Sequence, residues 1–274
     1  MATLSAARYG KAETRVVQVA RDGARHRITD LTVDVALTGD LADSHRTGDN
    51  AKLLPTDSQK NTVYAFARDG IDGVERFGIR LARHFVDSRP PVHTATVRVR
   101  EHPWTRVGDH SFTRAAGGEV RTAEVGYDGD TTTVRAGLAD LLLLNTTDSE
   151  FHGFLVDEYT TLQPTDDRIL ATAVTASWRY APGDVDHDKA YTAGRSALIE
   201  AFAGTYSYAL QQTLFAMGRR LLDDVPEAAE VSLALPNRHH FLVDLTPFHR
   251  DNPGLVFHAA DRPYGLVEGT VTRA

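Results

Sequence analysis

The chain has 274 residues and contains no cysteine. This absence excludes disulfide bonds, thiolate metal ligands, iron–sulfur clusters and cysteine nucleophiles, and it fits a reducing compartment. The first residues, MATLSAARYGKAETRVV, lack the apolar core of a signal peptide. No apolar run approaches the ~20 residues that a membrane span requires. We therefore predict a cytoplasmic protein with no membrane partner.

Positive charge is also scarce. The chain has 30 Lys and Arg residues against 37 Asp and Glu residues, which gives a formal net charge of −7, and no basic run stands out. Because nucleic-acid backbones attract clustered cations, we expect no nucleic-acid partner. A hydrophobic content of 42% and a charged content of 24% are ordinary for a soluble globular protein.

Several common catalytic motifs are missing as well. The sequence contains no GxGxxG, GxxxxGK[ST], GxSxG or HExxH, so dinucleotide-binding, P-loop, serine-hydrolase and zinc-protease interpretations have no residues to support them. His239 and His240 are adjacent, and neighbours in an extended strand point to opposite sides. They cannot both bind one ion from a regular strand, and we predict no metal site.

The chain does contain alternating patterns typical of strands and periodic patterns typical of helices. The predicted strands cover about residues 14–19, 31–37, 93–100, 119–127, 131–144, 169–180, 231–235, 241–245 and 264–272. The predicted helices cover about residues 58–68, 71–85, 189–203 and 207–222. The first half therefore runs strand, strand, helix, helix, strand, strand, and the second half follows the same order with one more closing strand. This repeat of order predicts two tandem domains, residues 1–130 and 131–274.

The order of elements also predicts the fold class. Consecutive strands joined by short turns favour antiparallel sheets with the helices layered on one face, which is an α+β fold. Two such sheets leave long open edges. Closure of those edges by assembly into an oligomeric barrel is a reasonable expectation.

The stretch FHGFLVDEYTTLQPTDDR, residues 151–168, is the most informative segment. It places Phe151 and Arg168 on one polar, turn-rich connection between two apolar runs. Phe offers a stacking face and Arg a planar fork of donors, a combination that suits a flat, anionic or carbonyl-rich heterocycle. The alternative is an exposed arginine in a solvated loop.

Two segments near the N-terminus carry further candidates. Lys11 precedes the first predicted strand, where a solvated surface lysine is the simpler interpretation. Thr56, Asp57 and Ser58 precede the first helix, and all three residue types are good helix N-caps.

The second half carries the remaining candidates. Ser207 is predicted to cap a helix, which places Leu210 and Gln211 in the next turn, where a free backbone N–H such as that of Leu210 can bind an anion. Asn237 and His239 are two residues apart and share one face of an extended segment, while His240 points away. The alternative for this pair is a turn with hydrogen-bonded polar side chains.

Five segments, in this order, resemble the urate oxidase (uricase) family of the tunnelling fold, or T-fold. They are ARYGKAETRV, TDSQKNTVYAFA, HPWTR, FHGFLVDEYTTLQPTDDRIL and LPNRHHFLVDL. The resemblance implies two tandem T-fold domains that assemble into a β-barrel tunnel. It also implies oxidation of urate by O2 and water to 5-hydroxyisourate and hydrogen peroxide in purine catabolism, with neither a metal nor an organic cofactor.

The resemblance assigns roles to the candidate residues. Phe151 would lie against the flat face of urate, and Arg168 and Gln211 would grip its edge with help from the backbone N–H of Leu210. The other implied substrate contacts are Thr56, Asp57 and Asn237. The implied proton relay consists of Lys11, Thr56 and His239, and the implied site for O2 or water consists of Thr56 and Asn237. Family members commonly have Val at the position of Leu210, which should matter little for a backbone contact.

The family assembles as a homotetramer in which Lys11 and Thr56 of one subunit would meet Phe151, Arg168 and Gln211 of another. Two alternatives remain open. One is a different tunnelling-fold enzyme acting on pterins or purines, some of which use zinc, although the missing cysteines count against it. The other is a non-catalytic purine-binding protein.

Overall fold

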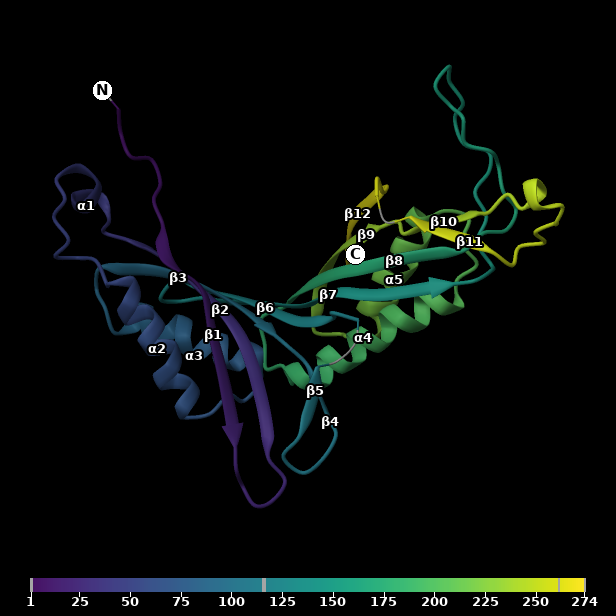
Figure 1. Ribbon diagram of the computed structural model, residues 1–274. Coiled ribbons are helices and arrows are strands. Elements are labelled where there is room, and N and C mark those ends of the chain that lie inside the picture. Colours follow the sequence, from purple (N-terminus) through teal and green to yellow (C-terminus); the bar gives the residue numbers. More distant parts are fainter. Residues whose placement is uncertain (1, 115–116, 261, 274) are drawn as a thin grey trace. The chain divides into compact units, whose positions relative to one another are not determined.

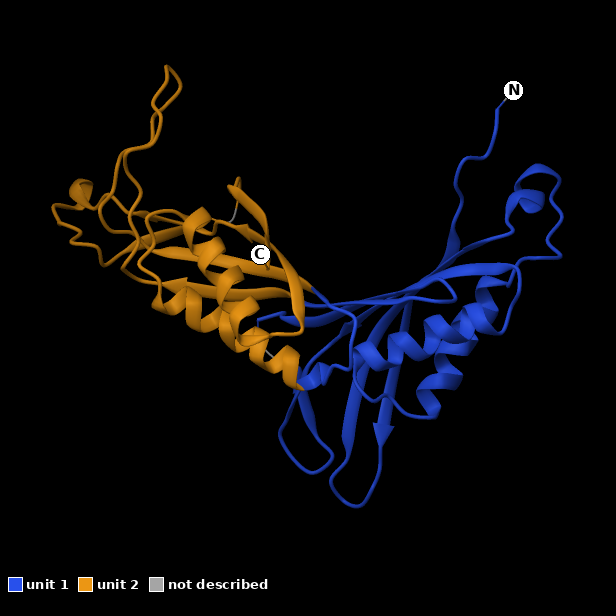
Figure 2. Ribbon diagram, turned by 180° about the vertical axis from the view of Figure 1, so that it is seen from behind, with its two compact units in different colours: residues 1–137, 179–188 blue, residues 138–178, 189–274 orange. Residues whose placement is uncertain are grey.

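The computed structural model describes residues 2–114, 117–260 and 262–273. They form an α+β fold made of two compact units, one of residues 1–137 and 179–188 and the other of residues 138–178 and 189–274 (Figure 2). Strands β7 (Thr132–Asn145) and β8 (Leu170–Tyr180) contribute residues to both units. The predicted α+β class is confirmed, while the domain boundary after residue 130 stays a prediction.

Unit 1 is an antiparallel sheet covered on one face by helices (Figure 1). Its strands run in the order β1 (Tyr9–Ala20), β2 (Arg27–Gly39), β3 (Val92–Glu101) and β6 (Val120–Tyr127). Its helices are α1 (Ala42–Arg46), α2 (Thr56–Arg68) and α3 (Val74–Asp87). Helix α2 packs on β1, and α3 packs on β3 and β6.

The alternation of side chains along β2 explains why the helices cover only one face. Leu31, Val33, Val35 and Leu37 are buried on one face, and they alternate with Thr32, Asp34 and Ala36 on the other face. Gly78 of α3 allows the helix to approach closely, because a Cβ atom there would lie 2.9 Å from a methyl carbon of Val125 on β6.

Unit 2 repeats this arrangement of strands and helices. The strand order is β7, β8, β9 (Ala228–Pro236) and β12 (Leu266–Thr272), with β9 and β12 antiparallel. Helix α5 (Leu210–Asp224) packs on β9 and β12, and most of α4 (His187–Gly204) belongs to the same unit. A Cβ atom on Gly218 of α5 would lie 2.6 Å from a methyl carbon of Val271 on β12. Both units therefore seat a helix on the sheet through a glycine.

Several short elements complete the fold. They are β4 (Trp104–Arg106), β5 (Phe112–Arg114), β10 (His239–Leu242), β11 (Phe257–Ala260) and the 3-10 turn η1 (Thr246–Phe248). The sequence patterns missed α1, β4, β5 and β11, which are too short to show a period. In the described part of the chain, no helix combines the length and the apolar composition needed to cross a membrane.

The predicted strand over residues 241–245 is wrong in its second half, because β10 ends at Leu242. The carboxylate of Asp244 instead accepts the backbone N–H of Thr246 at 2.9 Å and opens the turn η1. A side chain that pairs with nearby backbone in this way competes with a sheet ladder.

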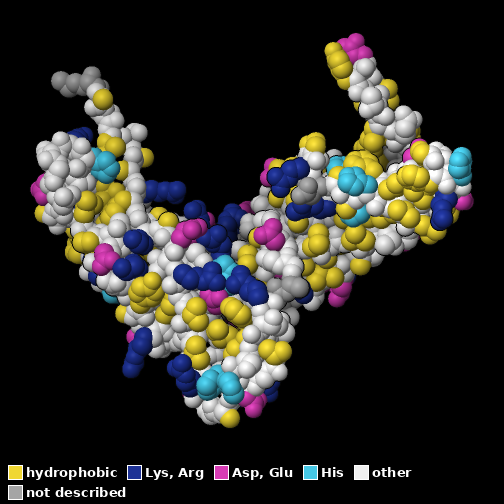
Figure 3. Space-filling model, in the orientation of Figure 1, with side chains coloured by type: hydrophobic (Ala, Val, Ile, Leu, Met, Phe, Trp, Pro, Cys, Tyr) yellow, Lys and Arg dark blue, Asp and Glu magenta, His cyan; other side chains and the backbone are white. Residues whose placement is uncertain are grey.

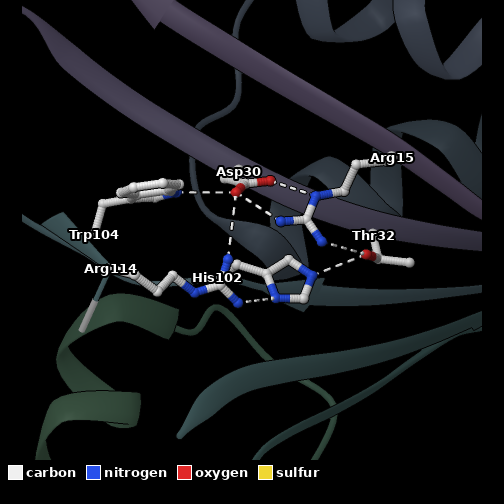
Figure 4. A network of polar contacts seen from close by, with 6 residues as sticks. All are labelled: Arg15, Asp30, Thr32, His102, Trp104 and Arg114. Atoms are coloured by element: carbon white, nitrogen blue, oxygen red, sulfur yellow. Dashed lines mark hydrogen bonds and ion pairs between the residues drawn. The ribbon is translucent and has the colours of Figure 1, made fainter. Parts of the chain in front are cut away.

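Asp30 is the centre of a buried polar network in unit 1 (Figure 4). Its side chain is 3% exposed and accepts hydrogen bonds from Nε and Nη2 of Arg15 at 2.6 and 2.7 Å. It also accepts Nε1–H of Trp104 at 2.9 Å, which fastens β4 to the sheet. Paired in this way, the buried carboxylate carries its charge at a much smaller desolvation cost than it would alone.

The same network fixes the proton on His102. Nη2 of Arg114 donates to Nδ1 of His102 at 3.1 Å, and Nε2 of His102 lies 2.8 Å from Oγ1 of Thr32. Because a guanidinium only donates, Nδ1 must accept and Nε2–H must donate. Burial lowers the pKa of His102, as does the Arg15 charge, so the neutral ring is favoured.

Replacement of Asp30 with Asn is expected to lower the free energy of unfolding at neutral pH by about 1–2 kcal/mol, because the half-exposed Arg15 loses a charged acceptor. Burial raises the pKa of Asp30, but its hydrogen bonds and neighbouring charges outweigh burial and leave the pKa below its usual value. The stabilisation is therefore complete above about pH 5 and is lost as the pH falls through the lowered pKa. Urea unfolding between pH 7 and pH 2 measures both effects.

The matched control is Asp22→Asn, which breaks an exposed pair with Arg27. It should leave the unfolding midpoint unchanged. If Asp30→Asn retained the acid-dependent loss of stability of the unaltered chain, the assignment to this network would be wrong.

Candidate active site

A cavity of about 580 Å³ lies in unit 2, bounded by the loop of residues 151–168, the start of α5 and the segment around β10. It brings together six of the predicted site residues that are far apart in the sequence. These are Phe151, Arg168, Leu210, Gln211, Asn237 and His239.

A pair of backbone hydrogen bonds closes the base of the loop. Phe151 donates its N–H to the carbonyl of Thr165 at 2.8 Å, and Thr165 donates to the carbonyl of Phe151 at 3.1 Å. This short antiparallel bridge brings Phe151 beside Arg168, three residues beyond Thr165. The bridge fixes the two ends of the loop, and the residues between Phe151 and Thr165 form its largely exposed tip.

A second bridge holds the start of this loop against the chain that leads into α5. Ser149 and Ser207 form a parallel bridge, in which Glu150 donates its N–H to the carbonyl of Ser207 at 2.9 Å. Ser207 in turn donates its N–H to the carbonyl of Asp148 at 2.9 Å. The bridge sets the first turn of α5 beside the loop.

A third bridge places the segment after β9. Thr172 and Asn237 are antiparallel partners, and the N–H of Arg238 donates to the carbonyl of Ala171 at 2.8 Å. The N–H of Asn237 donates to the carbonyl of Gly265, also at 2.8 Å. Asn237 is therefore tied on both sides, and its side chain lies at the cavity wall.

Arg168 and Phe151 lie in contact at one side of the cavity. The guanidinium carbon is 5.1 Å from the centroid of the Phe151 ring, and the ring of Phe154 stacks on Phe151 with centroids 5.1 Å apart. Burial lowers the pKa of Arg168, but a guanidinium remains charged at any ordinary pH. Within the described residues no carboxylate pairs with it. A partly buried, unneutralised guanidinium is suited to binding an anion.

The first turn of α5 provides further donors. The helix begins at Leu210 after Ala209, and no side chain caps it. Among the described residues, the backbone N–H groups of Leu210 and Gln211 have no acceptor. Free N–H groups at the positive end of a helix favour negative charge, as the sequence predicted for Leu210.

The predicted cap at Ser207 is wrong. Its hydroxyl accepts a hydrogen bond from Oγ1 of Thr213 at 2.8 Å, and both side chains are completely buried. The Ser207 side chain therefore stabilises the first turn of α5 through Thr213 and does not cap the helix. The N–H groups at its start stay free for a ligand.

His239 also lines the cavity, and its ring stacks on that of Phe241 with the ring centroids 5.5 Å apart. Burial lowers its pKa, and the charge of Arg168 lowers it further. The ring is therefore neutral near pH 7, with one nitrogen that donates and one that accepts.

His240 departs from the prediction, because it lines the cavity as well. Its Nδ1 lies 2.9 Å from the carbonyl oxygen of Arg238, which occupies that nitrogen. Both histidines belong to β10, which pairs in regular register with β11, yet the cavity reaches both residues.

Lys11, Thr56 and Asp57 belong to unit 1, and none of the described residues that line the cavity comes from that unit. Lys11 lies on β1 at an irregularity in its pairing with β2. The hydroxyl of Tyr9 accepts the N–H of Leu54 at 2.9 Å and so ties β1 to the segment before α2.

The predicted capping role of Thr56, Asp57 and Ser58 is wrong. Helix α2 begins at Thr56 itself, after Pro55, and no side chain caps it. The carboxylate of Asp57 instead accepts a hydrogen bond from Lys60, which with the Lys60 charge lowers the pKa of Asp57. The charge of Lys11 contributes to the same lowering of the Asp57 pKa.

Sequence patterns missed two contributors to the site. Ser149 belongs to no recognisable motif, yet its hydroxyl accepts Nε–H of Arg168 at 3.3 Å. Phe154 stacks on Phe151, but nothing in the sequence singled it out from the other apolar residues of the loop. Both roles depend on contacts across the fold, and no local signal would have identified them.

Comparison with known proteins decides the family. The sequence matches the family described as Uricase over residues 7–132 and 134–268. The chain belongs to the uricase family. The uricase of Arthrobacter globiformis is 51% identical over 267 residues, covering 97% of this chain and 88% of that protein. The uricase of Dictyostelium discoideum is 37% identical, with 100% and 99% covered.

Solved uricase structures share the fold. The crystal structure of the Arthrobacter globiformis uricase superposes with a TM-score of 0.97 at 50% identity and covers 100% of this chain and 96% of that chain. The urate oxidase of Bacillus sp. TB-90 has a TM-score of 0.83 at 21% identity, with 98% and 100% covered, and shows the fold alone. The resemblance to uricases of the tunnelling fold is therefore confirmed.

Replacement of Arg168 with Gln is expected to raise the pKa of His239. Burial and the Arg168 charge both lower that pKa now, and only burial would remain. An NMR titration of the His239 ring, assigned by comparison with His239→Gln, measures the change.

The matched control is Arg220→Gln, which removes a cation of the same unit that pairs with Glu200 and Asp224, each at 2.6 Å. It should leave the His239 titration unchanged. If Arg168→Gln also left the His239 pKa unchanged, the guanidinium of Arg168 would not act on the ring.

Proposed function

We propose that this member of the uricase family is a urate oxidase, which converts urate, O2 and water to 5-hydroxyisourate and hydrogen peroxide in purine catabolism. The observation that carries the proposal is the cavity of unit 2. It presents the unneutralised guanidinium of Arg168, the ring of Phe151 and the free N–H groups at the start of α5 to one space. A flat, anionic, carbonyl-rich purine satisfies all three.

The proposed grip on urate follows from these donors. Phe151 offers its ring to the flat face, and Arg168 supplies charge-assisted hydrogen bonds to one edge. The side-chain amide of Gln211 supplies a donor and an acceptor, and the N–H of Leu210 supplies another donor. A ligand without matching carbonyl groups would leave buried donors unpaired, at a cost of about 1–3 kcal/mol each.

The proposed chemistry requires proton transfer. Urate must lose a second proton before it is electron-rich enough to reduce O2 without a cofactor. We assign the relay to Lys11, Thr56 and His239, because a hydroxyl both accepts and donates and a neutral imidazole does the same. Thr56 and Asn237 would hold O2 or water above the urate plane, and Asp57 would contact the substrate beside Thr56.

The proposal includes an assembly. Lys11, Thr56 and Asp57 of one subunit would complete the cavity of another in a homotetramer that forms a β-barrel tunnel. Large apolar side chains support this, because hydrophobic groups gather on the surface over β10 and β11 (Figure 3). Leu255, between β10 and β11, is 76% exposed, and Leu155 and Tyr159 on the loop of residues 151–168 are 87% and 81% exposed. Extensive apolar surface of this kind marks an interaction site. A cytoplasmic location and independence from metals and organic cofactors are also part of the proposal.

The decisive experiment follows urate absorbance and O2 concentration together after exhaustive chelation, with peroxide measured at the end. Matched consumption of urate and O2 is expected. Turnover that requires added zinc, or that prefers a pterin, would favour a different tunnelling-fold enzyme. Urate binding without peroxide would favour a purine-binding protein.

Lys11→Met and Thr56→Ala are each expected to lower kcat by about 100-fold while changing KM only about threefold, because the relay acts on protons in the transition state. Steady-state kinetics on urate separate the two constants. The matched control is Lys52→Met, which removes an exposed lysine paired with Asp43 at 3.0 Å in the same unit. Its kinetics should be unaltered. A large rise in KM at constant kcat would contradict the relay.

Co-expression of Lys11→Met and Arg168→Gln chains is expected to restore about a quarter of the normal activity, because random pairing gives that fraction of sites two intact halves. Each chain expressed alone should be nearly inactive. Activity of separately purified and co-expressed preparations measures the recovery. Co-expressed chains as inactive as the single variants would show that each site is built within one subunit.

A further inference from the structure

A completely buried hydroxyl lies behind the guanidinium of Arg168. Ser149 is 0% exposed, and its Oγ accepts Nε–H of Arg168 at 3.3 Å. Among the described residues, Ser149 is the one that is hydrogen-bonded to the Arg168 side chain. It leaves the N–H groups of both Nη atoms available to a ligand, since a guanidinium has five donors.

Ser149 is itself held in position by the backbone on both sides. Its bridge with Ser207 fixes the main chain, through the N–H of Glu150 on the carbonyl of Ser207 at 2.9 Å. Ser207 is fixed in turn by the hydroxyl of Thr213 on α5, at 2.8 Å. Ser149, Ser207 and Thr213 are all 0% exposed, and we call these three residues the hydroxyl frame.

The hydroxyl frame links the two groups proposed to hold urate, the Arg168 side chain and the start of α5. Ser149 contacts Arg168, and Ser207 lies three residues before Leu210, whose free N–H begins α5. The side chain of Asp167, the residue before Arg168, accepts a hydrogen bond from the hydroxyl of Thr147 at 3.1 Å. Ser149 acts on the Arg168 side chain itself, through the hydrogen bond that it accepts from Nε.

We propose that Ser149 is a positioning residue that orients the Arg168 guanidinium toward the edge of urate. With Nε turned to Ser149, the two Nη groups form the fork that faces the cavity. A long side chain restrained before binding loses less rotamer entropy when the ligand arrives. The inference rests on the proposed function, since it assigns Arg168 to urate.

The test is a double-mutant cycle of Ser149→Ala and Arg168→Lys, read as the Kd of urate measured without O2 and as kcat and KM with O2. Ser149→Ala is expected to raise Kd and KM about 10-fold and to change kcat less than about threefold, because the hydrogen bond supports binding in both the ground and transition states. In lysine a methylene group stands where arginine has Nε. Removal of the Ser149 hydroxyl from the Arg168→Lys variant should therefore change Kd less than about twofold.

The matched control is Ser232→Ala, which removes a hydroxyl hydrogen-bonded to that of Thr270 at 2.8 Å on β9 and β12. It should leave Kd, KM and kcat unchanged. If Ser149→Ala does not fold, Ser149→Cys, which fills the site with a larger group that is a weaker acceptor, enters the same cycle.

The possible outcomes are distinct. Equal effects of the Ser149 change in the unaltered chain and in the Arg168→Lys variant would overturn the positioning role and leave a general packing role. An unchanged Kd in Ser149→Ala would overturn it as well. Failure of the unaltered protein to oxidise urate would instead refute the proposed function, and the anaerobic Kd would still test whether Ser149 acts through Arg168.

Discussion

The candidate site depends on backbone pairing at isolated positions outside the regular sheets. Three bridges, between Phe151 and Thr165, Ser149 and Ser207, and Thr172 and Asn237, bring a loop, a helix start and a strand end to one cavity. Polar backbone groups at a fold's interior must find partners, and here those partners are residues of other segments. Each pairing thus satisfies the backbone and also positions a side chain at the cavity.

The two units treat a partly exposed arginine side chain in opposite ways. Arg15 is neutralised by the buried carboxylate of Asp30, an arrangement that serves structure. Arg168 has a neutral hydroxyl as its partner, and its charge is left for a ligand. An uncompensated, partly buried cation costs stability, and this cost is commonly found where a protein binds an anion.

The free ends of two helices follow the same principle. Helices α2 and α5 both begin without a side-chain cap, and both carry proposed site residues in their first turn. A capping side chain would have occupied the donors that Leu210 and Gln211 leave free. Thr56 and Asp57 lie in unit 1, whereas the cavity beside the start of α5 lies in unit 2.

The sequence by itself determined the α+β class, the position of most strands and long helices, and the residue types of the site. Those features depend on local periodicity and on side-chain chemistry, as in the buried alternation of β2 or the pairing of Phe151 with Arg168. The tertiary structure alone decided the uncapped starts of α2 and α5, the place of His240 at the cavity and the contact of Ser149 with Arg168. Each of these depends on a hydrogen-bond partner or bridge that the local pattern does not specify.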